Sequence, residues 1–286
     1  MQMVKNLSLQ ENKLRDKISS IILCAGEGIR ISEYISNKPK PLIEIDEKPI
    51  LSHLISHLIK SQITSITIVT GHLKEQIENY ITEIKEKNDS LQDKILLVNS
   101  KDDYKKGPLY SFLSITNDKN ILKRDLIYLV FPGDTYFEFN LINELITSVK
   151  NNFALIQDNS MIFYQELQGI KLKKSEDSGK TISTIRTEEL KSVERVKHIE
   201  QIKLNSIRES AFYKKIIPVF VFGFKFIENI IDAEKETSVK TIREIVNLLI
   251  KGENYLYAFR LSPKSKFFDI DTKLDFLNLK KEKRGQ

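Results

Sequence analysis

The stretch ISSIILCAGEGIR, residues 18–30, decides the fold. Its short β-branched run from Ile18 to Leu23 predicts a strand that is buried on both faces. Gly26 and Gly28 then predict a turn whose backbone N–H groups can surround phosphate oxygens without side-chain obstruction. Arg30 adds a planar cationic group for the same phosphates. The pair of glycines is ambiguous alone, since neither the dinucleotide fingerprint nor a Walker loop is completed after it.

Strands and helices alternate through residues 18–150, which indicates a doubly wound, mainly parallel sheet of the α/β class. We expect strands at 18–23, 65–70, 94–98 and 125–131, and helices at 50–60, 75–86, 108–115 and 141–150. Right-handed crossovers place the carboxyl ends of such strands at one edge, where ligands bind. Both the glycine turn and the Pro132-Gly133-Asp134 turn fall at that edge.

The pattern changes after residue 151. We expect short strands at 154–156, 161–164, 169–172, 181–185, 216–222 and 254–261, and helices at 226–231, 239–251 and 272–281. The charge-rich segment 188–208 fits either a helix or an irregular excursion. Because no repeat or glycine/serine linker marks a boundary, we predict one domain at 18–281 with halves 18–150 and 151–281. Residues 1–17 then form an N-terminal extension, and 282–286 a tail.

The composition indicates a globular protein, with 41% hydrophobic and 29% charged residues among 286. The formal charge of +6 suits a polyanionic ligand, but the basic residues are spread along the chain, so no nucleic-acid partner is expected. A single cysteine, Cys24, excludes an internal disulfide and fits a buried strand residue better than a catalytic thiol. With no secretory signal and no membrane-length apolar run, we expect a cytoplasmic protein without membrane contact.

Three further motifs carry charge to the ligand edge. Lys40 stands between Pro39 and Pro41, which restrict the backbone and hold the cation near the glycine turn. Asp134 follows a buried strand, where a carboxylate is costly unless it meets a cation such as Mg²⁺. Asp269 and Asp271 lie at i and i+2, so that both share a face of an extended segment. Each motif alone also fits an ordinary surface turn or helix cap.

In this order the motifs resemble the sugar-phosphate nucleotidyltransferase superfamily, which contains the NDP-sugar pyrophosphorylase-like enzymes. The matching pattern is Leu-x-Ala-Gly-x-Gly-x-Arg, then Pro-Lys-Pro-Leu, a lone Asp after a strand, and Asp-x-Asp-Thr near the end. Segments 44–50, 66–72 and 106–113 are also similar to the family, so that the resemblance covers about 18–150 and 213–281. It implies a Rossmann-like, glycosyltransferase-A-like fold with a small acceptor-binding lobe.

The resemblance also implies roles for individual residues. Arg30 and Lys40 would be catalytic, Arg30 on the β- and γ-phosphates and Lys40 on the α-phosphate and the acceptor phosphate. Asp134, Asp271 and Asp269 would bind Mg²⁺. Nucleotide binding would fall to Leu23, Ala25, Gly26, Gly28, Gly107 and Ser111. The sequence departs from the family pattern at Ile29, where a hydroxyl side chain is usual, and at residues 158–212, which we cannot align.

The implied reaction is transfer of NMP from an NTP to a small phosphorylated acceptor, with release of pyrophosphate. The short chain and the final Asp-Ile-Asp-Thr look most like CTP-using enzymes that act on choline or polyol phosphates. UTP-, GTP- or dTTP-dependent transfer to sugar 1-phosphates stays open, as does a homodimer. A glycosyltransferase would carry Asp-x-Asp after the fourth strand, where this chain has Gly133-Asp134-Thr135. A non-catalytic nucleotide-binding subunit is the other alternative, against which the retained charged residues argue.

Overall fold

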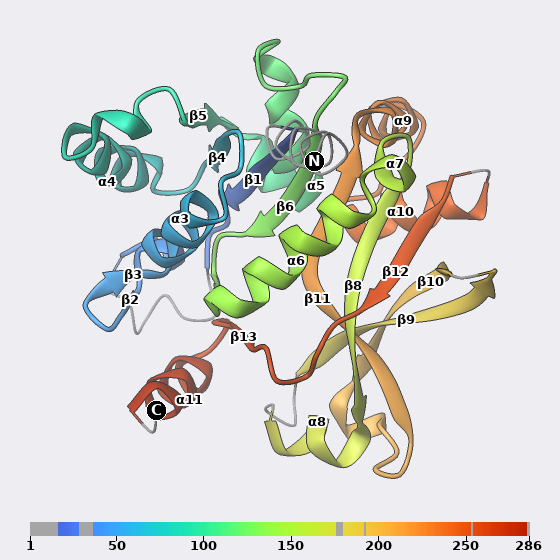
Figure 1. The fold of residues 1–286 in the computed structure, drawn as a ribbon. Coiled ribbons are helices and arrows are strands. Elements are labelled where there is room, and N and C mark those ends of the chain that lie inside the picture. The colour runs from blue at the N-terminus through green and yellow to red at the C-terminus, as the bar shows by residue number, and fades with distance from the viewer. Residues whose placement is uncertain (1–16, 29–36, 176–179, 192, 253, 285–286) are drawn as a thin grey trace, which may run out of the picture.

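A computed structural model describes residues 17–28, 37–175, 180–191, 193–252 and 254–284. The N-terminal extension up to residue 16, Arg30 and Ile29 therefore lie outside the described residues. Within them one nine-stranded sheet, in the order β5-β4-β1-β6-β11-β8-β12-β10-β9, runs through the molecule (Figure 1).

The first half forms the parallel part of this sheet, as the alternating pattern predicts. Strand β1 pairs in parallel with both β4 and β6, and β4 pairs in parallel with β5. The strands are β1 (Ile18–Cys24), β4 (Ile66–Thr70), β5 (Ile95–Asn99) and β6 (Ile127–Pro132). The helices between and after them are α3 (Ile50–Lys60), α4 (Lys74–Glu86), α5 (Pro108–Leu113) and α6 (Phe139–Asn151). The carboxyl ends of the four parallel strands meet at one edge of the sheet. This places the glycine turn after β1 beside the turn after β6.

The second half extends the sheet with a mixed arrangement. Strand β11 pairs antiparallel with β6 and β8, β12 pairs parallel with β8, and β10 pairs antiparallel with β12 and β9. These strands are β8 (Ser160–Gln168), β9 (Thr181–Leu190), β10 (Val193–Lys203), β11 (Phe212–Gly223) and β12 (Leu256–Arg260). The helices are α7 (Phe153–Ile156), α8 (Gly169–Ser175), α9 (Phe224–Glu234), α10 (Ile242–Lys251) and α11 (Lys273–Arg284).

Two expected strands are wrong. Residues 154–156 lie in helix α7, and residues 169–172 lie in helix α8. In both cases the apolar run is too short to distinguish a period of two from a period of 3.6. The undecided segment 188–208 proves to be mostly strand, because β9 and β10 pair antiparallel over ten residues of β10. The long β9–β10 hairpin lies at the opposite edge of the sheet from β5, away from α3 and α4 (Figure 1).

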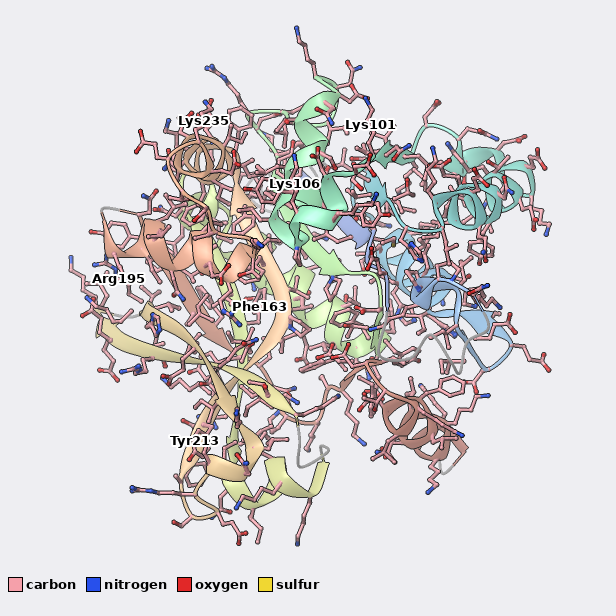
Figure 2. The ribbon with its side chains drawn as sticks, turned by 180° about the vertical axis from the view of Figure 1, so that it is seen from behind. Lys101, Lys106, Phe163, Arg195, Tyr213 and Lys235 are labelled. Atoms are coloured by element: carbon pink, nitrogen blue, oxygen red, sulfur yellow. The ribbon has the colours of Figure 1, made fainter. Side chains whose placement is uncertain are left out.

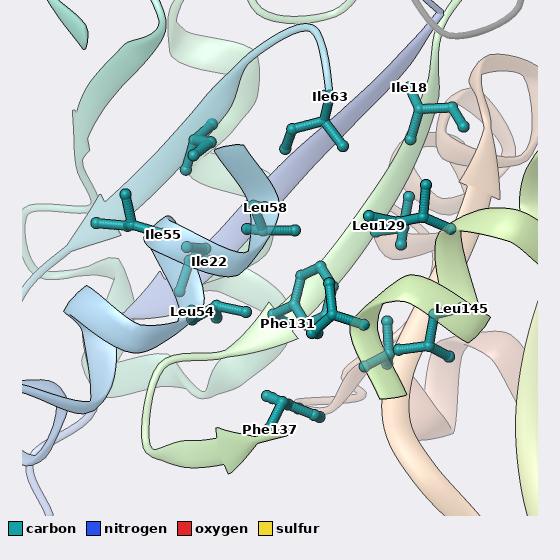
Figure 3. Close-up of a cluster of buried hydrophobic side chains, with 14 of the residues drawn as sticks. Ile18, Ile22, Leu54, Ile55, Leu58, Ile63, Leu129, Phe131, Phe137 and Leu145 are labelled. Carbon is teal, nitrogen blue, oxygen red and sulfur yellow. The ribbon is translucent and has the colours of Figure 1, made fainter. Parts of the chain in front are cut away.

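The core has a layer on each face of the sheet. Ile22 of β1 and Phe131 of β6 pack on one face against helices α3 and α6 (Figure 3). Ile21 and Val130, their chain neighbours, pack on the other face with residues of α5, α9 and α10. Figure 2 views the molecule from that second side. Burial on both faces explains why apolar residues occupy consecutive positions, such as Ile21 and Ile22 in β1, rather than alternating positions.

Candidate active site

A pocket of about 400 Å³ opens where β1 and β6 end. The first half supplies one wall, and the start of α10 and strand β11 supply the other. It is lined by Leu23, Cys24, Ala25, Gly26, Lys40, Pro41, Tyr104, Pro108, Ser111, Val130, Phe131, Pro132, Asp134, Pro218, Phe220, Ile242 and Arg243. Six residues that the resemblance assigns to the site thus share one pocket, namely Leu23, Ala25, Gly26, Lys40, Ser111 and Asp134.

Gly28 and Gly107 are outside this lining but adjoin it. Gly28 has φ of +63°, and a Cβ there would lie 3.0 Å from Cγ of Lys40, so the glycine turn passes directly against that side chain. Gly107 has φ of +128°, and a Cβ would lie 2.6 Å from the Lys240 carbonyl oxygen. The N–H of Leu109, two residues later, donates to that same oxygen at 3.0 Å. Gly107 therefore seats α5 against the segment before α10.

Lys40 is the centre of the charged part of the site. It begins a short 3₁₀ turn (Lys40–Leu42) after Pro39, and its side chain is only 10% exposed. Its Nζ donates to Asp134 Oδ2 at 3.1 Å and to Asp271 Oδ1 at 2.9 Å. The two flanking prolines fix the backbone, so the ammonium is held where residues from 94 and 231 positions away meet it.

The charge state of Lys40 follows from these contacts. Burial alone would lower the pKa of the ammonium, but the charges and hydrogen bonds of Asp134 and Asp271 outweigh it and raise the pKa above its ordinary value. Lys40 is therefore a permanent cation at neutral pH. Such a fixed charge at a phosphate-binding edge can stabilise the negative charge that builds up in phosphoryl chemistry.

Asp269 and Asp271 meet different partners. Asp269 ends strand β13 (Phe267–Asp269), which pairs antiparallel with β7 (Thr135–Phe137), and its Oδ1 accepts from Thr135 Oγ1 at 2.5 Å. The Asp269 side chain is accessible to solvent, but it lies in the lining of a concave part of the protein surface. Desolvation, opposed by the Thr135 hydrogen bond and reinforced by the Asp134 charge, raises the pKa of Asp269 to about 6. Asp271 lies beyond the strand and contacts Lys40 instead.

The carboxylates fit a hard divalent cation only in part. Among the described residues, no group of three or more His, Cys, Asp or Glu side chains is placed to hold a metal ion. Asp134 and Asp271, however, converge on one point beside Lys40, and each remains 37% exposed. Mg²⁺ takes one or two carboxylates and fills its shell with phosphate oxygens and water, so this pair suits it once a phosphorylated ligand is bound.

Asp269→Asn should stabilise the fold at pH 7 and leave it unchanged near pH 3. The folded pKa of about 6 lies above the ordinary aspartate value of 3.8, so the native state holds this proton more tightly than the unfolded chain. Its contribution is therefore lost as pH rises from about 4 through 6. The Asn carbonyl still accepts the Thr135 bond. Thermal unfolding at the two pH values measures the difference, and equal Tm shifts would contradict it.

Gly133→Ala should destabilise the turn that carries Asp134. A Cβ at Gly133 would lie 2.5 Å from Cys24 Sγ and 2.8 Å from the Leu23 carbonyl oxygen. Overpacking of this kind costs about 1–3 kcal/mol. Gly26→Ala is the matched control, since a Cβ there meets nothing within 4 Å. Chemical denaturation should show a lower unfolding free energy for Gly133→Ala only, and equal values would refute the packing argument.

Cys24 and the two histidines of α3, His53 and His57, are packed residues rather than reactive groups. Burial raises the pKa of the Cys24 thiol, with a further contribution from Asp134, so the thiol stays protonated and poorly nucleophilic. His53 Nε2 donates to the Ile45 carbonyl at 2.8 Å. Burial, helped by His53 and Lys60, lowers the pKa of His57 to about 4. The two histidines lie on α3 and pack against the rings of Tyr136 and Phe139, so we assign them to packing rather than to a metal centre.

Several lining residues were not foreseen from the sequence. Pro218 and Phe220 enter the pocket from β11, next to a register shift between Ile217 and Phe220. Arg243 enters from the first turn of α10, between Thr241 and Glu244 of the capping box. The capping box was visible as Thr-x-x-Glu before an apolar run, but nothing in the sequence relates that helix end to β1. These positions follow from tertiary pairing alone.

A model of the family described as "Nucleotidyl transferase" matches residues 19–167, which include β1, Lys40 and Asp134. This chain belongs to the nucleotidyl transferase family. "Bifunctional protein GlmU" of Methanococcus maripaludis strain C5 is 34% identical over 158 residues. That match covers 51% of this chain and 34% of the relative, so the chain matches about a third of its curated relative's length.

Solved structures of the family confirm the predicted fold. UDP-glucose pyrophosphorylase complexed with UDP-glucose gives a TM-score of 0.68 at 15% identity, covering 94% of this chain and 99% of that one. CTP:phosphocholine cytidylyltransferase from Streptococcus pneumoniae gives 0.63 at 22%, covering 93% and 99%. At these identities the likeness concerns the fold alone. No helix in the described part of the chain is long and apolar enough to cross a membrane.

Proposed function

We propose that this protein transfers a nucleoside monophosphate from an NTP to a small phosphorylated acceptor and releases pyrophosphate. The observation that carries the proposal is Lys40, a nearly buried cation between Asp134 and Asp271 at the edge where β1 and β6 end. Phosphoryl-type transfer needs positioned positive charge more than it needs a nucleophile from the protein. Family membership and the adjoining glycine turn point to the same chemistry.

In this scheme an acceptor phosphate oxygen attacks the α-phosphorus in line with the departing pyrophosphate. The acceptor phosphate is already ionised at neutral pH, so no general base is required. Lys40 would bind the α-phosphate and the incoming phosphate together, offsetting the repulsion between two anions and fixing their approach. Asp134 and Asp271 would hold Mg²⁺, which would supply charge neutralisation on the phosphate oxygens. Arg30 is proposed for the leaving pyrophosphate from the sequence pattern.

The pocket also suits a nucleoside. Its apolar walls from Pro108, Phe220 and Ile242 can contact a base and ribose, while Ser111 offers a hydroxyl group. CTP is the proposed nucleotide because Asp269-Ile270-Asp271-Thr272 looks most like the corresponding segment of CTP-using members. UTP, GTP or dTTP with a sugar 1-phosphate would use the same phosphate-binding residues and is therefore an outcome of the test.

The test is a panel of the four NTPs against phosphorylated acceptors with Mg²⁺, followed by pyrophosphate release. We expect release that requires both substrates and that is highest with CTP. A preference for another NTP would correct the base but retain the reaction. NTP binding without release across a broad panel would instead indicate a non-catalytic nucleotide-binding subunit.

A further inference from the structure

A second cavity, of about 690 Å³, lies between α8, β13 and α11. Figure 1 shows these three elements around the lower part of the molecule. Lysines from five separate segments converge on it, together with three carboxylates, Asp269, Asp275 and Glu282. The lysines are Lys171, Lys174, Lys180, Lys215, Lys266 and Lys281. The charge of this cavity is thus strongly positive in a chain whose basic residues are otherwise dispersed.

Each carboxylate in the cavity already has a partner. Asp275 pairs with Lys180 at 2.7 Å and also accepts from the Thr272 hydroxyl at 2.9 Å. Glu282 pairs with Lys266, and Asp269 accepts from Thr135. Because six lysines line the cavity against three carboxylates, the acidic side chains cannot neutralise the whole set. A concave surface lined by one sign of charge concentrates the potential and attracts small anions of the other sign.

The cavity adjoins the proposed transfer centre through strand β13. Asp269 lies in its wall, and the N–H of the next residue, Ile270, donates at 3.2 Å to the carbonyl oxygen of Asp134, which lines the first pocket. Two residues after Asp269, Asp271 contacts Lys40. A ligand whose phosphate lies at Lys40 could therefore extend its other end toward the lysines.

From this arrangement we infer that the cavity receives the body of the acceptor, and that the acceptor carries a second anionic group, a carboxylate or a further phosphate. The inference rests on the proposed function and narrows its substrate class. It disfavours phosphocholine, because a quaternary ammonium is usually bound by the faces of aromatic rings. Here the Phe267 ring already has Lys215 Nζ 5.0 Å from its centroid.

Binding without turnover tests the inference separately from the reaction. Calorimetry would compare a sugar bisphosphate, a phosphorylated sugar acid and a neutral-ended sugar monophosphate on the intact chain. We expect both probes that carry a second anionic group to bind at least about tenfold more tightly than the monophosphate, since a charge-assisted hydrogen bond is worth a factor of about ten or more in affinity. A preference for only one of the two would identify the second group as phosphate or carboxylate.

The variant Lys171→Gln/Lys174→Gln should abolish that preference. Lys173→Gln is the matched control, because Lys173 lies on the same helix, pairs with Glu209 and is outside the cavity lining. In turnover, the double variant should raise KM for an acceptor that carries a second anionic group and leave kcat and the KM for NTP unchanged. Equal affinity for all probes, or efficient turnover of phosphocholine, would overturn the inference while leaving nucleotidyl transfer intact. Absence of pyrophosphate release with every acceptor would instead contradict the proposed function.

Discussion

Lys40→Ala is expected to lower kcat by about 10²–10³-fold while changing KM for the NTP much less, a loss typical of removing one preorganised charge from a transition state. The ammonium is held by Asp134 and Asp271, so it is already positioned before substrates bind. Its removal leaves the two phosphates to approach without the bridging cation. Steady-state pyrophosphate release with both substrates varied measures the two constants separately.

Two controls separate the role of Lys40 from general basicity. Lys38→Ala removes a lysine from the same proline-flanked segment, but Lys38 is 41% exposed and pairs with Glu44. Its kcat should stay near the wild-type value. Lys40→Arg keeps the charge but changes its shape, so activity should be recovered only in part. Near-wild-type turnover of Lys40→Ala would remove Lys40 from the mechanism.

Asp134→Ala should lose Mg²⁺-dependent activity by a factor on the order of 10³ or more, because metal-ion charge stabilisation is worth several kcal/mol. Asp134 is the carboxylate that lines the nucleotide pocket and contacts Lys40 as well. Added Mg²⁺ should not restore the rate. Titration of pyrophosphate release with Mg²⁺ measures both the maximum and the midpoint.

The matched control for Asp134 is Asp102→Ala. Asp102 follows β5 in the chain, but its side chain is 84% exposed and pairs with Lys105. Its Mg²⁺ titration should overlay that of the wild type. If Asp134→Ala also gave an unchanged titration curve, Asp134 would be ruled out as a metal ligand.

Much of the site could be predicted because its parts lie next to strong local signals. Ile18 to Leu23 is a short run with three β-branched isoleucines that favours a strand buried on both faces, and the turns after β1 and β6 then share an edge by topology. Lys40 between two prolines is likewise a local constraint. The position of Asp134 near Lys40, 94 residues apart, followed from these rules together.

The remainder depended on contacts between distant segments. The i, i+2 spacing predicted that Asp269 and Asp271 share one face. In the structure β13 pairs with β7, so that Asp269 accepts a hydrogen bond from Thr135, whereas Asp271 contacts Lys40. Short apolar runs such as 154–156 carry no usable period, so helix α7 was missed. The lysine-lined cavity joins five segments, and no local pattern could have assembled them.

The most direct test of nucleotidyl transfer follows the phosphates of one NTP. The protein would be incubated with Mg²⁺, acceptor and CTP labelled either on the α- or on the γ-phosphate. The account predicts that the α-label moves into a compound containing the acceptor and the γ-label appears in pyrophosphate. Recovery of the γ-label in the acceptor or as free phosphate, with nucleoside diphosphate as the other product, would contradict it.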